Sequence, residues 1–139
     1  MKKTIALVSS LFFLYGCGDL DNPGGVLTAN QLPDSVIQHI KDKNILSNEE
    51  IIAYYDVTIS LDNSESAILT NKNIIYYKTG RINKIALNNV KSISQLEDCF
   101  GVCIFIETNN NKTMKIDIAP FNGGDLFLQL LQSQTSNYL

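Results

Sequence analysis

The feature that most constrains the fold is a series of short apolar runs that begins near residue 50, with turn-forming residues between them. Alternating apolar and polar side chains are typical of strands with one buried face. The connections are short and rich in Gly, Asn and Asp, so we expect neighbouring strands to pair antiparallel in sequence order. The pattern predicts seven strands, over 51–61, 66–70, 74–78, 81–87, 92–97, 102–108 and 113–118.

A helical pattern precedes the strands. Pro33 favours a first helical turn, and Lys41 and Lys43 suit the negative end of a helix dipole. We therefore predict one short amphipathic helix within 28–46, with Val36, Ile37 and Ile40 on its apolar face. His39 lies off this face, so we expect it to be exposed to solvent.

A second helix is predicted after Pro120. Either Asn122 or Asp125 could cap its first turn, because both side chains accept hydrogen bonds from free backbone N–H groups. The helix needs a surface to cover, since apolar residues recur on one side. This apolar face is predicted to consist of Leu126, Phe127, Leu130 and Leu131.

The first residues have the layout of a secretory signal: Lys2 and Lys3 precede an apolar run over 5–14. That run is about half the length that a membrane-spanning helix needs, which makes a permanent span the weaker interpretation. The run ends in the sequence Leu-Tyr-Gly-Cys at 14–17, which resembles the bacterial lipobox. The resemblance implies cleavage before Cys17 and lipid on its sulfur. The alternative is an ordinary signal peptide with an accidental cysteine.

These observations predict the organisation of the chain. A lipoprotein signal peptide (1–16) is followed by the lipidated cysteine with a flexible tether (17–27), a helical segment (28–46), the β domain (47–134) and a short tail (135–139). The lipobox resemblance implies a lipid anchor on the periplasmic side of a cell membrane. Gly18 favours the outer membrane if the organism has one, because enteric lipoproteins retained in the inner membrane tend to have aspartate there.

Charge excludes some partners. The chain of 139 residues has the size of one ordinary domain, and after removal of 1–16 it carries 9 basic and 14 acidic residues. Nucleic acids, anionic membranes and phosphoinositides are bound by clusters of Lys and Arg, which this sequence lacks. We therefore expect no nucleic-acid partner.

Three stretches resemble bacterial PH-like domains of the pleckstrin-homology superfold: LSNEEIIAYY at 46–55, AILTNKNIIYY at 67–77 and IALNNVKSI at 85–93. The similarity covers about 46–132. It implies a mainly β fold with two helices, in which a seven-stranded antiparallel PH-like barrel is capped by the C-terminal helix. A β-sandwich of another topology is the alternative.

Cys99 and Cys103 flank the predicted turn between the fifth and sixth strands, and in an exported protein this spacing favours a structural disulfide. Separately buried thiols are the main alternative. A redox pair is less favoured because three residues separate the cysteines and no helix start lies beside them. A zinc site is less favoured still, since no histidine or further cysteine is near.

The sequence shows no catalytic or metal-binding constellation. The carboxylates in and beside the predicted strands have no histidine or nucleophile paired with them, so we expect solvated charges on the outer face. They are Asp56, Glu97, Asp98, Glu107 and Asp117. In the pairs Tyr54-Tyr55 and Tyr76-Tyr77, we expect one ring in the core and the other facing outward.

The sequence therefore favours a non-catalytic protein or peptide interaction module of the cell envelope, with no cofactor and no metal. The alternative is an envelope protein that binds a lipid or another small ligand. An enzyme, either a hydrolase using the carboxylates or a thiol redox protein using Cys99 and Cys103, is the least favoured class.

Overall fold

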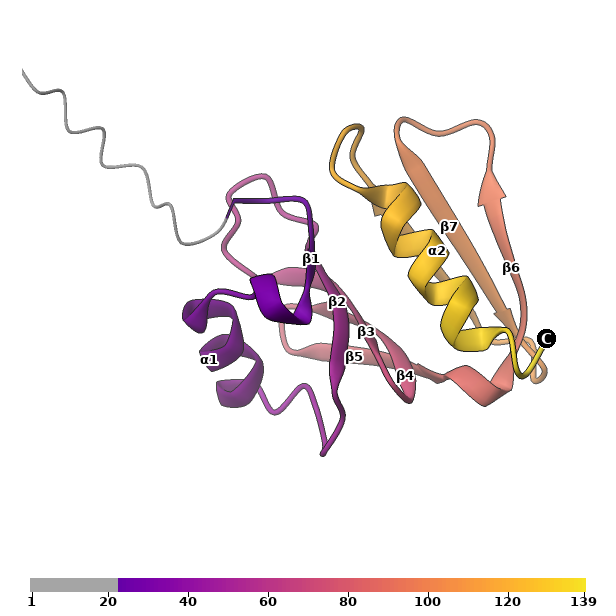
Figure 1. The fold of residues 1–139 in the computed structure, drawn as a ribbon, viewed down its shortest axis with the longest axis horizontal. Helices are drawn as coiled ribbons and strands as arrows, with labels where there is room; N and C mark the ends of the chain where they lie inside the picture. The colour runs from indigo at the N-terminus through magenta and orange to yellow at the C-terminus, as the bar shows by residue number, and fades with distance from the viewer. Residues whose placement is uncertain (1–22) are drawn as a thin grey trace, which may run out of the picture.

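The computed structural model describes residues 23–139 and is mainly β with two α-helices (Figure 1). One antiparallel sheet has the strand order β1-β2-β3-β4-β5, and the other has the order β6-β7-β8. The strands are β1 (Val26–Thr28), β2 (Ile51–Asp56), β3 (Glu65–Thr70), β4 (Asn73–Lys78), β5 (Arg81–Ala86), β6 (Val90–Leu96), β7 (Val102–Thr108) and β8 (Thr113–Ile118). The helices are η1 (Ala29–Gln31), α1 (Asp34–Asp42), η2 (Leu87–Asn89) and α2 (Gly124–Thr135).

Strand β1 was not predicted. It covers the last two residues of the predicted tether (17–27) and the first residue of the predicted helical segment (28–46), and it pairs with β2, so that Val26 stands opposite Tyr55. The Val26 N–H also donates to the Asn122 carbonyl over 2.8 Å. Leu27 is buried in the cluster beneath α1. Burial of this side chain and the backbone pairing explain why the ordered domain begins before residue 28.

The predicted pairing in sequence order fails between β5 and β6. Helix η2 turns the chain there from the first sheet into the second, and the buried side chains of Leu87 and Val90 fix the corner. The result is an open barrel of two sheets with eight strands. Strand β2 also ends at Asp56, five residues before its predicted end, because the chain leaves the sheet in a loop over 57–64.

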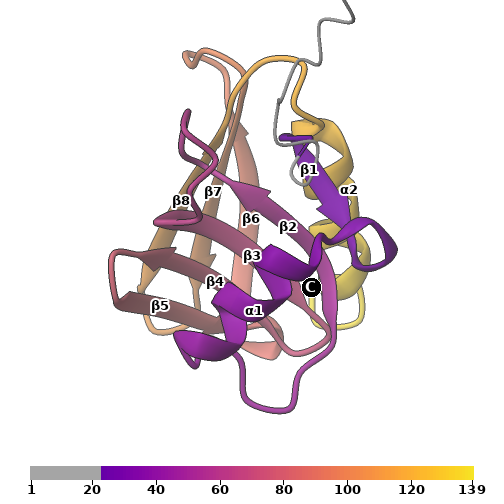
Figure 2. The ribbon, with the colours of Figure 1, turned by 90° about the vertical axis from the view of Figure 1, so that its left-hand side faces the viewer.

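Two apolar clusters cover both faces of the five-stranded sheet. The larger lies between the two sheets and α2, and the smaller lies between the outer sheet face and α1 (Figure 2). Tyr55 belongs to the first cluster and Tyr54 to the second, so both rings are buried, contrary to the expectation that one faces outward. Of the second pair, Tyr77 is buried in the smaller cluster, and Tyr76 is half-buried and packs against the larger one. The cover provided by α1 explains the difference at Tyr54.

Helix α2 packs against both sheets, because it contacts β7 in the second sheet, β1 and β2 in the first, and η2 between them. Its N-cap is Gly123, with φ of 80°, and neither Asn122 nor Asp125 takes this position. The buried positions include Phe127 and Leu131, whereas Leu126 is 39% exposed and was wrongly placed on the apolar face. In the described part of the chain, neither helix is long and apolar enough to cross a membrane.

Candidate functional site

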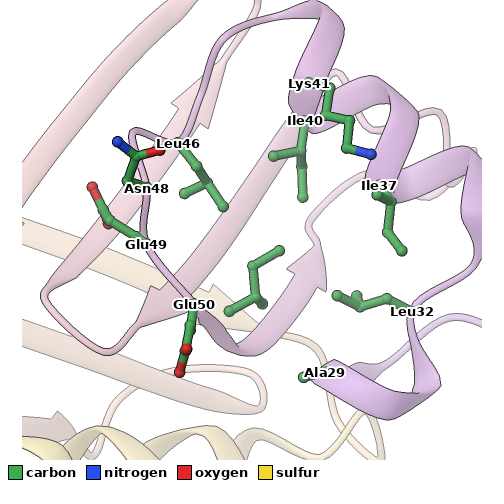
Figure 3. A pocket seen from close by; sticks show the side chains of 10 residues that line it. Ala29, Leu32, Ile37, Ile40, Lys41, Leu46, Asn48, Glu49 and Glu50 are labelled. Atoms are coloured by element: carbon green, nitrogen blue, oxygen red, sulfur yellow. The ribbon is translucent and has the colours of Figure 1, made fainter.

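An apolar groove lies between η1, α1 and the segment 44–50, with a cavity volume of about 680 Å³. Figure 3 shows aliphatic side chains around the cavity and polar side chains of the 44–50 segment along one side. The lining residues are Ala29, Leu32, Ile37, Ile40, Lys41, Leu46, Asn48, Glu49, Glu50 and Ile51.

The groove forms because the sheet covers only some of the aliphatic side chains around α1. Val36 and Ile40 pack into the cluster on the sheet. Ile37 lines the groove and is only half-buried. Leu32 and Leu46 pack against the edge of the cluster and are also half-buried. The groove was not predicted from the sequence, because Ile37 was expected on the same buried face as Val36 and Ile40.

Glu49 fastens one wall of the groove to the sheet. Its side chain is only 4% exposed, and its carboxylate lies 2.8 Å from the Lys84 Nζ and accepts a 2.7 Å hydrogen bond from the Thr70 hydroxyl. Burial opposes ionisation, but the hydrogen bonds from Lys84, Asn73 and Thr70 outweigh it and lower the pKa of Glu49. The neighbouring Glu50 N–H donates to the Asn71 side chain over 3.2 Å. This wall is therefore formed without a ligand.

Asp56 is buried, contrary to the expectation of a solvated carboxylate. It accepts hydrogen bonds from the Thr58 N–H and hydroxyl and from the Asn63 N–H, at 2.8, 2.5 and 2.8 Å. The Tyr54 hydroxyl donates to the Asn63 side chain over 2.6 Å, and burial together with the Asp56 charge raises the pKa of Tyr54. These contacts close the loop over 57–64, which gives Asp56 a structural role.

The other four carboxylates are spread over the second sheet and its loops. Glu97, Asp98 and Asp117 are exposed as expected. Glu107 is half-buried and lies 2.9 Å from the Lys91 Nζ on the neighbouring strand. Within residues 23–139, no group of three or more Asp, Glu, His or Cys side chains is arranged to hold a metal ion.

His39 was predicted to be exposed to solvent, but it is not. The side chain is half-buried, its Nε2 atom is buried without a hydrogen-bond partner, and its ring lies edge-on to Tyr77 with the centroids 5.6 Å apart. The packing of α1 on the sheet causes this, because residue 39 lies next to the buried Ile40 and reaches β4. Helical periodicity places His39 off the apolar face of α1. It does not show how much of the helix surface the sheet covers.

Cys99, in the β6–β7 loop, and Cys103, near the start of β7, are brought together. Their Cα atoms lie 6.2 Å apart and their sulfur atoms are at bonding distance, which supports the predicted disulfide. Between them, Gly101 has φ of 106°, and a Cβ there would collide with the Ile118 carbonyl. The loop is therefore held tightly against the end of β8. Cys17 and the lipobox lie outside the described residues, so lipidation stays a prediction.

A match to a protein-family model supports the PH-like fold. The family model described as Bacterial PH domain matches residues 45–127. A similar solved structure is that of the C-terminal domain of an unknown protein from Leishmania infantum, with 18% sequence identity, 74% of this chain and 97% of that chain covered, and a TM-score of 0.46. A search of curated proteins found no match. Because the family model spans more than half of the sequence, this chain belongs to the bacterial PH domain family.

Proposed function

We propose that this chain is a lipid-anchored, non-catalytic interaction module of the bacterial cell envelope, whose PH domain binds an apolar peptide segment of a partner protein in the groove beside α1. The groove is the observation that carries the proposal. Leu32, Ile37, Leu46 and Ile51 are all half-buried around one cavity, and burial of their remaining apolar surface would favour binding.

The chemistry of the rim suits a peptide. Lys41, Asn48 and Glu50 are exposed beside the aliphatic side chains, so hydrogen bonds to a peptide backbone are available next to the apolar contacts. A few polar groups around an apolar pocket are typical of sites that orient a ligand. Because the wall carrying Glu49 is already fixed, little conformational entropy is lost on binding.

The position of the groove is compatible with a membrane anchor. The described chain enters beside the loop before α2, whereas the segment 44–50, which forms one wall of the groove, lies at the other end of the domain in Figure 2. If Cys17 carries the lipid, the groove remains accessible to a partner in the envelope.

Site-specific photocrosslinking tests the groove. We place a photoreactive amino acid at Lys41, on the rim, and at Lys91, an exposed control position on β6, and irradiate cells that express the full-length protein. A specific partner should crosslink at position 41 alone, and Ile37→Glu should abolish the product while leaving the circular dichroism spectrum unchanged. Equal crosslinking at both positions, or products indifferent to Ile37→Glu, would contradict groove binding.

A second function is favoured by the size of the cavity, because about 680 Å³ lies within the usual range for small-molecule sites. In that case an acyl chain or another small apolar ligand occupies the groove. Native mass spectrometry of the purified full-length protein distinguishes the two functions. A bound mass that Ile37→Glu removes would support the small ligand, and a ligand-free spectrum would favour the peptide.

The anchor is tested by the intact mass of membrane-extracted protein beside a Cys17→Ser variant. The expected species lacks residues 1–16, carries acyl chains, and gains two alkyl groups from a thiol reagent only after reduction. Lipidation of Cys17 would account for the acyl mass, and the pair Cys99 and Cys103 would account for the alkylation. An unacylated full-length species would refute the anchor.

A further inference from the structure

Three large apolar side chains are almost completely exposed at one end of the domain. Ile59, Phe100 and Phe121 are 104%, 88% and 106% exposed. They come from three different connections, β2–β3, β6–β7 and β8–α2. Single exposed apolar residues are ordinary on protein surfaces, but three at neighbouring loop tips form a pattern that needs a reason.

The three loops adjoin one another. Gly101, next to Phe100, packs against the backbone of 118–120. Ile59 lines one cavity together with Ala119 and Asn122, which flank Phe121 in the β8–α2 loop. In both Figure 1 and Figure 2 these connections lie at the top of the domain, away from the C-terminus.

The chain also enters the domain at this end. Gly25 lies against the backbone of Asn122, and Val26 is hydrogen-bonded to the carbonyl of the same residue. Only the six residue steps from Cys17 to Pro23 separate the lipobox cysteine from the described chain, a span of at most about 20 Å. A lipid on Cys17 would therefore keep this end of the domain close to the bilayer.

We propose that Ile59, Phe100 and Phe121 form a membrane-insertion tip, which enters the surface of the bilayer that holds the lipid anchor. The inference rests on the proposed lipidation of Cys17 and adds a second, non-covalent contact with the same membrane. The tip fixes how the domain is oriented, whereas the lipid alone fixes only its distance from the bilayer.

The exposed charges near the tip are negative, which favours a zwitterionic lipid surface over an anionic one. The connections 57–64, 97–101 and 119–123 contain no Lys or Arg, whereas Asp62, Glu97 and Asp98 are exposed in them. An anionic lipid surface would repel these carboxylates. The occupant that fits is a bilayer of neutral headgroups, such as phosphatidylethanolamine and phosphatidylcholine, whose acyl region receives the apolar side chains.

The tip is built from ordered loops. The Asp56 carboxylate holds the loop that carries Ile59, and the paired cysteines hold the loop that carries Phe100. Phe121 has φ of 65°, a conformation that is unfavourable for an aromatic residue and that projects its ring into solvent. Apolar side chains held outward on ordered loops lose little conformational freedom when they enter a membrane.

Tryptophan fluorescence tests the tip, because the chain contains no tryptophan. Phe100→Trp and Phe121→Trp place the reporter at the tip, and Tyr138→Trp is the control at an exposed position beyond the opposite end of α2. The variants are expressed from the full-length sequence, extracted from membranes and reconstituted in phosphatidylethanolamine and phosphatidylcholine vesicles with or without bromine on the acyl chains. We expect a blue shift and a loss of most of the fluorescence at 100 and 121, and no change at 138.

Two further measurements separate the possible failures. In the Phe121→Trp protein, Ile59→Asn with Phe100→Asn should reduce the quenching while circular dichroism stays unchanged. Intact mass of the same sample reports acylation. If the protein is acylated but the tryptophans at 100 and 121 are not quenched, the membrane-insertion tip is overturned and the lipid anchor is not. The same result is expected if the three side chains contact a protein partner instead of the bilayer. An unacylated protein overturns both, and quenching that increases with anionic lipid overturns the assigned lipid class.

Discussion

Replacing Phe127 tests whether α2 is an integral part of the core. The side chain is fully buried in the cluster between the two sheets, and the helix above it has no other aromatic residue. Transfer of a buried phenylalanine out of water contributes about 1.5–3 kcal/mol, and the cavity left by Phe127→Ala adds to the loss. From the transfer and cavity contributions together, we expect a decrease of about 3–5 kcal/mol in the free energy of unfolding. For a domain of this size that corresponds to a fall of about 12–20 °C in Tm.

Leu126→Ala is the matched control, because it shortens the neighbouring side chain of the same helix at a position that is 39% exposed. We expect a loss of no more than about 1 kcal/mol. Urea denaturation followed by circular dichroism measures both variants, and an unchanged dependence on urea concentration would show that the unfolded state is comparable. Equal losses at the two positions, or a loss below about 1 kcal/mol for Phe127→Ala, would refute the packing of α2 described above.

Three further outcomes can be checked by the same denaturation assay. Because the pKa of Glu49 is lowered in the folded protein, its ion pair with Lys84 stabilises the domain above the ordinary pKa of 4.5 and is lost as the pH falls through the folded value. Glu49→Gln should therefore cost about 1–2 kcal/mol at neutral pH and less at about pH 3, and an equal cost at both would contradict the assignment. Gly124→Ala should destabilise the domain by about 1–3 kcal/mol despite the helix preference of alanine, since the added Cβ would collide with Val102, and a stabilised variant would show that the contact relaxes. Replacing both Cys99 and Cys103 by serine should cost no more than about 2 kcal/mol because the closed loop is short, and a larger loss would show a wider role in the core.

The elements that sequence predicted well are those in which local pattern and final environment agree. Strands β3 to β8 combine alternating side chains with turn residues at their ends, and the structure places each within two residues of its predicted bounds. The paired cysteines were also visible, because a turn between neighbouring strands brings its two ends together whatever the rest of the fold does.

The errors share a cause, which is that burial depends on what covers a residue. Tyr54 follows the alternation of its strand, but α1 covers the face that the pattern leaves outside. The same packing half-buries His39. Strand β1 has three residues, too few for any periodicity, and forms because β2 offers a free edge. Asp56 is polar in sequence, and only the folded loop supplies the N–H groups that surround its carboxylate.

The groove and the exposed loop tips were less predictable than the strands. A half-buried isoleucine such as Ile37 has the same sequence signature as a core isoleucine, so a cavity beside a helix leaves no separate pattern. Ile59, Phe100 and Phe121 stand in connections, where an apolar residue could equally fold back onto the domain. Only the arrangement of three loops in space shows that they meet at one end.

Strand β1 has a mechanical consequence for a protein held by its N-terminus. Tension from an anchor at Cys17 would enter the domain at Val26, whose N–H bonds the Asn122 carbonyl, and then reach the three-residue pairing with β2. When the force acts across the strand, the hydrogen bonds of this edge pairing are loaded one after another, and β1 would separate from β2 before the remaining sheet carried the force. Its release would lengthen the connection to the membrane by about 10 Å. Strand β1 would thus be the first element of the described domain to yield to tension on its N-terminal side.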